Sequence, residues 1–296
     1  MAKSFMVSYG GIMNLIKETR FIMDKYGIQA NKKLGQNFLI DENIVNGIVE
    51  HAEISKKDLV IEIGPGLGTL TSKLLEKAGK VIAVELDKNV LEILNDRFQL
   101  YHNFELINQD ILKTDLKKLI QENLNSEINT CKVVANLPYY ITTPIIMKLL
   151  EENLNLESIT VMVQKEVANR LTAIPGENKE AGAISYSIYY YSDAETVLNV
   201  PRNCFIPSPE VDSAVINLKL LKSPRIEIQD EKFLFQVIKV AFSQKRKTLV
   251  NSLVNNKICT SKQEAENSLI ELGLNPKARG EELSLQDFAD LVEKLK

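Results

Sequence analysis

The segment Asn136-Leu137-Pro138-Tyr139 carries the side chains with the clearest chemical use in this sequence. An aromatic amine is a poor nucleophile because its lone pair is delocalised into the ring, so a site that alkylates it needs hydrogen-bond acceptors instead of a base. The side-chain oxygen of Asn136 and a backbone carbonyl around Leu137 are such acceptors. Pro138 fixes the turn and donates no proton. Tyr139 offers a ring on which an unstacked base can lie.

A base reaches such a pocket only by leaving its stack, at a cost of a few kcal/mol. A second aromatic wall is expected from Phe205, which lies in the proline-flanked segment 203–209. Two plainer interpretations stay open at this point. The segment 136–139 consists partly of turn formers and suits an ordinary turn after a strand. A single phenylalanine is more often a core residue than a clamp.

A glycine-rich loop, Gly64-Pro65-Gly66-Leu67-Gly68, follows a β-rich run and opens a helical pattern. Glycines there let the backbone pass close to a ligand. The spacing departs from the dinucleotide pattern because the third glycine comes one residue early, and Pro65 removes an amide donor. A dinucleotide needs a cradle for pyrophosphate, whereas S-adenosylmethionine carries no phosphate. We therefore expect S-adenosylmethionine as the cofactor, with Gly64 and Gly66 beside it.

Two acidic residues stand where the next two β-rich runs end. Glu85 is placed to accept both ribose hydroxyls, and Asp110 to accept a proton from the exocyclic amine of the cofactor's adenine. Leu86 and Ile111 supply apolar neighbours for the adenine ring. Taken alone, each acid is more often a surface group or a helix cap.

Short β-rich runs alternate with helical periodicity through the first two thirds of the chain. The helical stretches include Leu67–Lys77 and Lys88–Gln99. The expected strands are Leu59–Ile63, Val81–Val84, Phe104–Ile107, Lys132–Ala135 and Ile159–Val163. This alternation predicts the α/β class, with a doubly wound, Rossmann-like parallel sheet whose ligands collect at the carboxyl ends of the strands.

The alternating segment Val211–Leu221 predicts a last strand, and Lys222-Ser-Pro-Arg225 then breaks the pattern. We expect an N-terminal helical extension over 1–30, a methyltransferase domain over 31–222 and a smaller all-helical domain over 223–296. The helices expected outside the sheet are Gly11–Gly27, Lys232–Asn255, Ser261–Leu272 and Ser284–Leu295.

Charge gives a weaker indication of a nucleic-acid partner. The net charge of -3 argues against an indiscriminate nucleic-acid coat protein. The stretch Ala241–Lys257 nevertheless has no acidic residue and contains Lys245, Arg246 and Lys247, which are the best candidates for phosphate contact. An ordinary solvated helix face is the alternative.

The remaining composition excludes several classes. Hydrophobic residues make up 45% and charged residues 25% of the chain, which is typical of a globular protein. No signal peptide or membrane span is expected, so we expect a cytoplasmic protein. We expect neither disulfides nor a metal site from the scattered cysteines, and no histidine chemistry; these residues are Cys131, Cys204, Cys259, His51 and His102.

Taken together, these motifs resemble the 16S ribosomal RNA adenine dimethyltransferase family. The resemblance runs from Lys33 to about Ser284. The motifs that carry it are Leu34–Asp41, the glycine loop, Val84–Asp87, Gln109–Ile111, Asn136–Tyr140, Gln164–Arg170, Phe205–Ala214 and Ala241–Thr248. So many separate motifs in one order make it specific.

The resemblance implies further residues and a substrate. Asn37 and Leu39 would touch the methionine part of the cofactor, together with Asn136. The expected reaction is N6,N6-dimethylation of two adjacent adenines in a hairpin loop near the 3′ end of 16S rRNA. The expected partner is this RNA within the small ribosomal subunit or its precursor, bound by a monomeric enzyme with a role in subunit biogenesis.

Three other functions stay open. A related enzyme that methylates an adenine of large-subunit RNA shares the fold and cofactor motifs. A catalytically idle methyltransferase fold acting as an assembly factor is the second. A dehydrogenase is a distant third, because the glycine loop suits a dinucleotide poorly.

Overall fold

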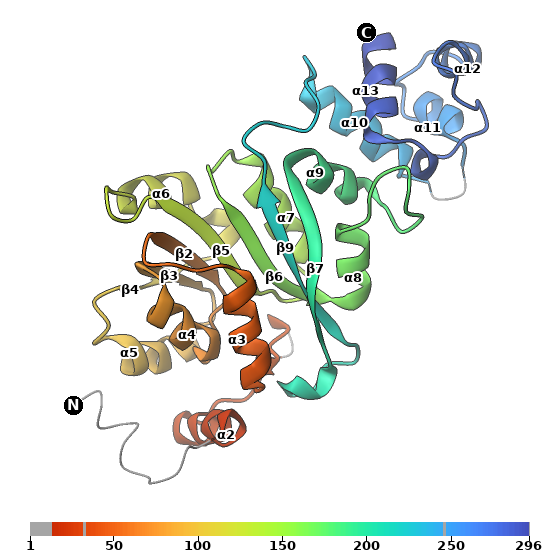
Figure 1. The fold of residues 1–296 in the computed structure, drawn as a ribbon. Coiled ribbons are helices and arrows are strands. Elements are labelled where there is room, and N and C mark those ends of the chain that lie inside the picture. Colours follow the sequence, from red (N-terminus) through yellow and green to blue (C-terminus); the bar gives the residue numbers. More distant parts are fainter. Residues whose placement is uncertain (1–13, 32–33, 245–246, 296) are drawn as a thin grey trace. The chain divides into compact units, whose positions relative to one another are not determined.

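The computed structural model describes residues 14–31, 34–244 and 247–295 (Figure 1). Contacts divide the chain into two compact units. The first unit comprises Met1–Ala168 and Glu195–Lys219, and the second comprises Asn169–Ala194 and Leu220–Lys296. The expected class is confirmed, since an α/β sheet is accompanied by a smaller group of helices.

Seven strands form one sheet in the order β4-β3-β2-β5-β6-β9-β7. Their bounds are β2 (Asp58–Ile63), β3 (Lys80–Glu85), β4 (Phe104–Asn108), β5 (Thr130–Asn136), β6 (Ser158–Gln164), β7 (Ser192–Val200) and β9 (Ser213–Leu220). The five strands expected to be parallel pair in parallel, which confirms the prediction. The predicted last strand is β9 and pairs antiparallel with β6, while β7 was not predicted.

The order of the strands creates the binding crevice. From β2 the chain builds outward through β3 to β4, then returns to the other side of β2 with β5 and β6. The connection that follows β2 therefore leads toward one edge of the sheet, and the connection that follows β5 leads toward the other edge. In open α/β sheets, ligands bind outside the carboxyl ends of the strands at such a point.

Helices cover both faces of this sheet (Figure 1). Val60, Val81 and Val134 share one buried cluster with α3, α4 and α5, whereas the alternate residues Ile61 and Ile82 are equally buried outside that cluster. The helices that lie in the first unit are α2 (Leu15–Tyr26), α3 (Glu42–His51), α4 (Thr69–Lys77), α5 (Leu91–Phe98), α6 (Leu116–Asn123) and α7 (Thr142–Glu151), with the short turns η2 (Lys88–Val90), η3 (Ile111–Lys113) and η4 (Arg202–Cys204). Both faces must be covered because both carry apolar side chains.

Gly68 is required where the glycine loop enters α4. Its φ is 83°, and an added Cβ would lie 2.4 Å from Cε2 of Phe98. We expect Gly68→Ala to lower the free energy of unfolding by about 3 kcal/mol, because the left-handed backbone and the overpacked ring both cost stability. Gly64→Ala is the matched control, since Gly64 has φ 65° but nothing within 4 Å of the added Cβ. For this control, urea denaturation should show that the free energy of unfolding falls by only about 1 kcal/mol. Equal losses in both variants would contradict the packing argument.

The second unit is helical, and Tyr186 lies at its centre. The Tyr186 ring packs edge-on against Phe288 with centroids 5.2 Å apart, and its hydroxyl donates to the Leu283 carbonyl at 2.5 Å. The elements are α9 (Ala183–Tyr191), α10 (Glu231–Ala241), α11 (Leu249–Asn255), α12 (Lys262–Glu271), η5 (Gly280–Glu282) and α13 (Leu285–Lys294), while α8 (Lys165–Leu171) lies at the division between the units. Residues 169–194 thus cluster with the C-terminal helices, whereas the sequence pattern predicted a single domain over 31–222.

The helix expected over Lys232–Asn255 is wrong, because two helices stand there. Phe242 ends α10, where its ring packs 5.4 Å from that of Tyr186, and the Thr248 side chain caps the start of α11. The other helix ends agree better with prediction. Ser284 caps α13 together with Asp287, and left-handed Gly27 closes α2.

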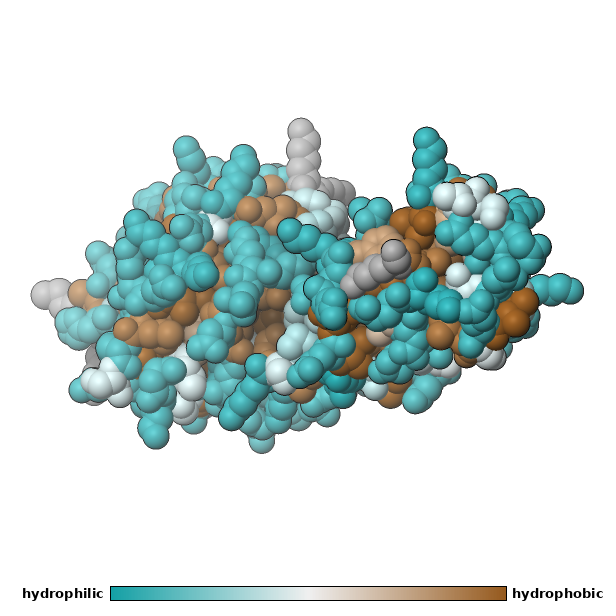
Figure 2. Space-filling view, turned by 90° about the horizontal axis from the view of Figure 1, so that it is seen from above, coloured by the Kyte–Doolittle hydropathy of each residue, from teal (hydrophilic) through white to brown (hydrophobic). Residues whose placement is uncertain are grey.

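Hydrophilic side chains dominate the face seen in Figure 2, and hydrophobic residues show between them in smaller areas. No helix in the described ranges has both the length and the apolar character needed to cross a membrane. The three cysteines are buried and form no disulfide with one another.

Candidate functional site

A pocket lies at the carboxyl ends of β2, β3 and β5, where the strand order branches. It encloses about 1160 Å³ of space, part of which is open to solvent. All nine residues predicted to bind the cofactor line it, namely Asn37, Leu39, Gly64, Gly66, Glu85, Leu86, Asp110, Ile111 and Asn136. The predicted target-base residues Leu137, Pro138 and Tyr139 line the same pocket. The fold therefore brings together residues that are far apart in the sequence.

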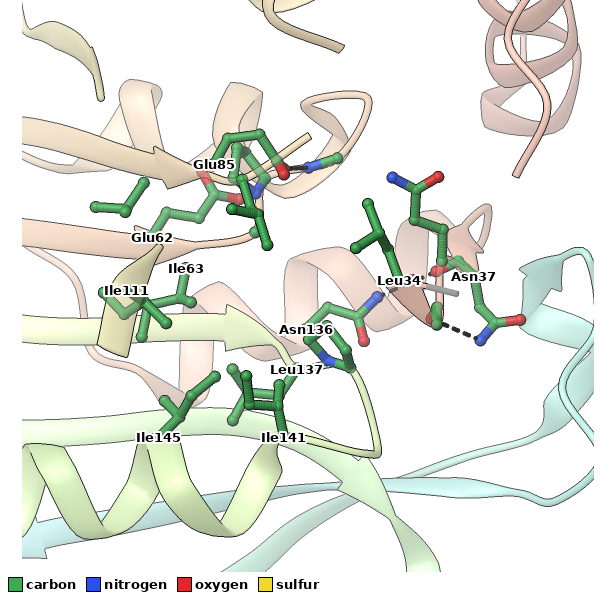
Figure 3. Close-up of a pocket in the computed structure, with 18 of the residues that line it drawn as sticks. Leu34, Asn37, Glu62, Ile63, Glu85, Ile111, Asn136, Leu137, Ile141 and Ile145 are labelled. Carbon is green, nitrogen blue, oxygen red and sulfur yellow. Dashed lines mark hydrogen bonds between the residues drawn. The ribbon is translucent and has the colours of Figure 1, made fainter. Parts of the chain in front are cut away.

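Glu85 links the end of β3 to the glycine loop (Figure 3). Its Oε2 accepts a hydrogen bond from the Gly66 N–H at 3.3 Å, and its Oε1 accepts one from the Asp87 N–H at 2.7 Å. Burial raises the pKa of Glu85, and these two N–H groups oppose that shift. Because each carboxylate oxygen has two lone pairs, both oxygens keep the capacity to accept a ligand hydroxyl.

Leu86, Asp110 and Ile111 line the same pocket as Glu85. Asp110 caps η3, with its Oδ1 accepting from the Leu112 N–H at 3.0 Å, so the cap interpretation of this residue is also correct. Ile111 is buried, whereas half of Leu86 (50%) is exposed. An exposed leucine at the mouth of a pocket is suited to contact a flat apolar ring.

The lining of the pocket is acidic. Glu62, Glu85 and Asp110 lie in it, and none of its described lining residues is a lysine, arginine or histidine. Within the described part of the chain no His, Cys, Asp and Glu residues group to hold a metal ion. Such a lining repels a pyrophosphate and suits a ligand with net positive charge, such as a sulfonium. The residues present therefore fit S-adenosylmethionine.

Residues 34–39, which precede the sheet in the chain and which we call the strap, line one side of this pocket. The Asn136 Nδ2 donates to the Asn37 carbonyl at 3.2 Å, as Figure 3 shows. The Gln36 Nε2 donates to Asp87 Oδ2 at 2.7 Å. The Phe38 ring of the strap lies 3.4 Å from where a Cβ on Gly66 would stand, which is an ordinary contact distance, and the left-handed φ of 56° is what favours glycine at this position.

The last residue of β5 and the turn after it present acceptors toward the pocket. Because the Asn136 Nδ2 is held by the strap, its Oδ1 is left to accept a proton from a ligand. The Pro138 carbonyl already accepts from the Ile141 N–H and the Thr142 hydroxyl, both at 3.2 Å. Among the backbone carbonyls here, that of Leu137 is consequently the better candidate.

Two tyrosines of the site differ in hydrogen bonding and in exposure to solvent. The Tyr139 hydroxyl hydrogen-bonds the Ser213 hydroxyl at 2.7 Å, and burial raises its pKa. Tyr140, for which the sequence motif predicted no role of its own, lines the pocket and is 59% exposed. Tyr139 is thus held in place, and Tyr140 lies open beside it.

Phe205 does not form the predicted clamp. It is 3% exposed, does not line the pocket, and belongs to the buried cluster with Phe38 and Leu39. Strand β8 (Phe205–Ile206) pairs antiparallel with β1 (Phe38–Leu39). Burial of its ring stabilises the attachment of the strap, which explains why the plainer core interpretation holds.

One acidic residue of the lining was not predicted, and Lys247, a predicted phosphate-contacting residue, does not line the pocket. Glu62 lines the pocket although the sequence predicted no role for it; a charged residue inside a buried parallel strand is the signal that could have indicated one. Of the predicted phosphate-contacting residues, Lys245 and Arg246 lie outside the described residues. Lys247 is exposed in the turn before α11 and not on a helix.

Comparison with known proteins agrees with this geometry. The family model described as "Ribosomal RNA adenine dimethylase" matches residues 27–296. Proteins named "Ribosomal RNA small subunit methyltransferase A" from Geobacillus sp. and Bacillus licheniformis are each 49% identical, with 94% of this chain and 95% of theirs aligned.

Two solved structures are similar as well. A dimethyladenosine transferase from Plasmodium falciparum has a TM-score of 0.69 and 28% identity, with 86% of this chain and 95% of that chain covered. The 23S rRNA methyltransferase ErmE has a TM-score of 0.66 and 25% identity, with 88% and 99% covered. Because the family model spans almost the whole chain and the curated relatives align over 94% of it, this chain belongs to the ribosomal RNA adenine dimethylase family.

Proposed function

We propose that this chain uses S-adenosylmethionine to dimethylate N6 of two adjacent adenines in a hairpin loop near the 3′ end of 16S rRNA. The observation that carries the proposal is the single pocket in which acid-lined cofactor residues meet the acceptors of segment 136–139. The cofactor supplies the methyl group from its sulfonium. The substrate is proposed as this RNA within the small ribosomal subunit or its precursor, bound by a monomer in the cytoplasm.

We assign the cofactor half of the pocket as follows. Glu85 accepts the ribose hydroxyls, and Asp110 accepts from the adenine amine with its free oxygen. Leu86 and Ile111 contact the adenine ring. The methionine end lies against Asn37, Leu39, Gly64, Gly66 and Asn136.

The target half needs no base. The Asn136 Oδ1 and the Leu137 carbonyl each accept one proton of the adenine amine, which directs the nitrogen lone pair toward the methyl group. Pro138 shapes the turn and Tyr139 stacks on the base. Once the lone pair is used, the nitrogen becomes acidic and water collects the proton. Alignment is therefore the main contribution of these residues.

Methylation of isolated subunits tests this proposal and separates its rivals. Small and large subunits lacking the modification are incubated with the protein and cofactor, and their RNA is analysed by mass spectrometry. We expect two dimethyladenosines in 16S rRNA and none in 23S rRNA. Modification of 23S rRNA would identify the large-subunit enzyme, for which the similarity to ErmE is a specific reason. Cofactor binding without any methylation would identify an idle scaffold.

The basic stretch 245–247 gives a separate prediction. We expect replacement of Lys245, Arg246 and Lys247 by alanine to weaken binding to the small subunit and to reduce the slope of log K against log salt by about 2 to 3. The control is alanine at Lys56, Lys57 and Lys77, which are exposed and precede β2 or β3. An unchanged slope in the first variant, measured by filter binding, would mean that the stretch is only a solvated surface.

A further inference from the structure

Tyr140 places an exposed aromatic ring at the edge of the pocket. It lines the pocket and is 59% exposed. Phe21 and Tyr101 are exposed as well, at 52% and 42%, but neither lines the pocket. A single exposed aromatic residue is ordinary on a protein surface. An exposed ring at the edge of a site for an unstacked base is instead well placed to receive another base, because every base has a face that stacks on an aromatic ring.

The backbone holds Tyr140 directly beside Tyr139. The Ile141 N–H donates to the Pro138 carbonyl at 3.2 Å, so the two tyrosines are the central residues of one turn. The Thr142 hydroxyl donates to the same carbonyl at 3.2 Å, and α7 begins at Thr142. The position of Tyr140 is therefore fixed by the turn and the helix start, although its side chain is exposed.

The strap lies against one edge of the Tyr140 ring. A Cβ built on Gly35 would stand 3.5 Å from Cδ1 and 3.6 Å from Cε1 of this ring, which are ordinary contact distances. The same Cβ would stand 3.4 Å from the Cβ of Pro138. The strap thus supports the ring from one edge, and more than half of the residue remains open to solvent.

The proposed substrate offers a second base at this place. Its two adenines are adjacent in the RNA, so a single phosphodiester link joins them. When one adenine lies on Tyr139 with its amine at Asn136, the other has to lie close by, outside the position that the first one fills. The Tyr139 hydroxyl is bonded to Ser213 at 2.7 Å, which keeps that ring at the target position. Tyr140 is the next aromatic residue of the turn and is open to the neighbouring base.

We propose that Tyr140 is a specificity-determining residue, which stacks on the base adjacent to the target adenine. The inference rests on the function proposed above. The contact makes methylation depend on the neighbour of the target as well as on the target itself. It favours two consecutive unstacked bases over a lone extruded adenine.

The test removes the ring and the neighbouring base, singly and together. Small subunits are reconstituted with 16S rRNA in which one of the two adenines is replaced by an abasic nucleotide, and the other adenine remains the target. Both placements of the abasic nucleotide are made. Single-turnover methylation at subsaturating subunit concentration is measured for these two substrates and for the intact one.

On intact subunits we expect Tyr140→Ala to lower the rate about 5- to 50-fold, with the affinity for S-adenosylmethionine unchanged within about twofold. With the abasic nucleotide on the stacking side, the unaltered protein should be slower by a similar factor. Tyr140→Ala should then cause less than about twofold further loss, because the partner of the ring is already absent. The same relative loss from Tyr140→Ala on all three substrates, or no loss on any of them, would overturn the inference.

Two control variants separate stacking from other effects. Tyr140→Phe keeps the ring and removes the hydroxyl, so we expect it to restore the rate to within about twofold of the original. Tyr101→Ala removes an exposed tyrosine that does not line the pocket, and its rates should match those of the unaltered protein. A phenylalanine variant as slow as the alanine variant would assign the effect to the hydroxyl and contradict stacking. Absence of methylation by the unaltered protein on intact subunits would instead contradict the proposed function.

Discussion

Replacing Asn136 with alanine is expected to lower the rate of methyl transfer to the small subunit by about 10²- to 10³-fold, while the affinity for RNA stays within about twofold. The physical reason is that the variant loses the Oδ1 acceptor for the target amine. It also loses the bond from Nδ2 to the Asn37 carbonyl, which holds the strap over the pocket. Single-turnover rates and filter binding on the same subunits measure the two quantities.

Asn136→Asp separates these two losses. The aspartate keeps an acceptor oxygen but has no N–H to donate to Asn37, so we expect a rate between those of the original protein and the alanine variant. Thermal melting of both variants checks that the sheet remains folded. If the alanine variant methylated at the original rate, Asn136 would have no role in activating the amine.

Glu85→Ala should raise the dissociation constant for S-adenosylmethionine by about 30- to 10³-fold, because charge-assisted hydrogen bonds to the ribose are worth roughly 2 to 4 kcal/mol together. The same change removes the acceptor for the Gly66 N–H and so loosens the glycine loop. Calorimetry with 5′-methylthioadenosine should show a similar loss, since this ligand keeps the ribose.

Glu105→Ala is the control for Glu85. Glu105 lies on the neighbouring strand β4, pairs with Lys80 at 2.6 Å, and does not line the pocket. Its removal should leave cofactor affinity unchanged. An equal loss in both variants would indicate a general effect on the sheet instead of a contact with the ribose.

Much of the site was predictable because its residues follow local patterns. Four of the five parallel strands are short buried runs, and the residues at the strand ends lie at the crevice by the rule that governs open α/β sheets. Glu85, Asp110 and Asn136 were found in this way, without knowledge of their contacts. The caps Ser284 and Gly27 were likewise readable, because capping depends on neighbours within one turn of helix.

What the sequence by itself determined was the five parallel strands, the glycine loop and the acids and amide at the strand ends. The tertiary structure alone decided which way several aromatic and buried groups point. Phe205 is buried in one cluster with Phe38 and Leu39, residues 169–194 belong to the second unit, and the Glu62 Oε2 has no hydrogen-bond partner among the described residues. Side-chain burial depends on elements distant in the chain, and no local pattern specifies those neighbours.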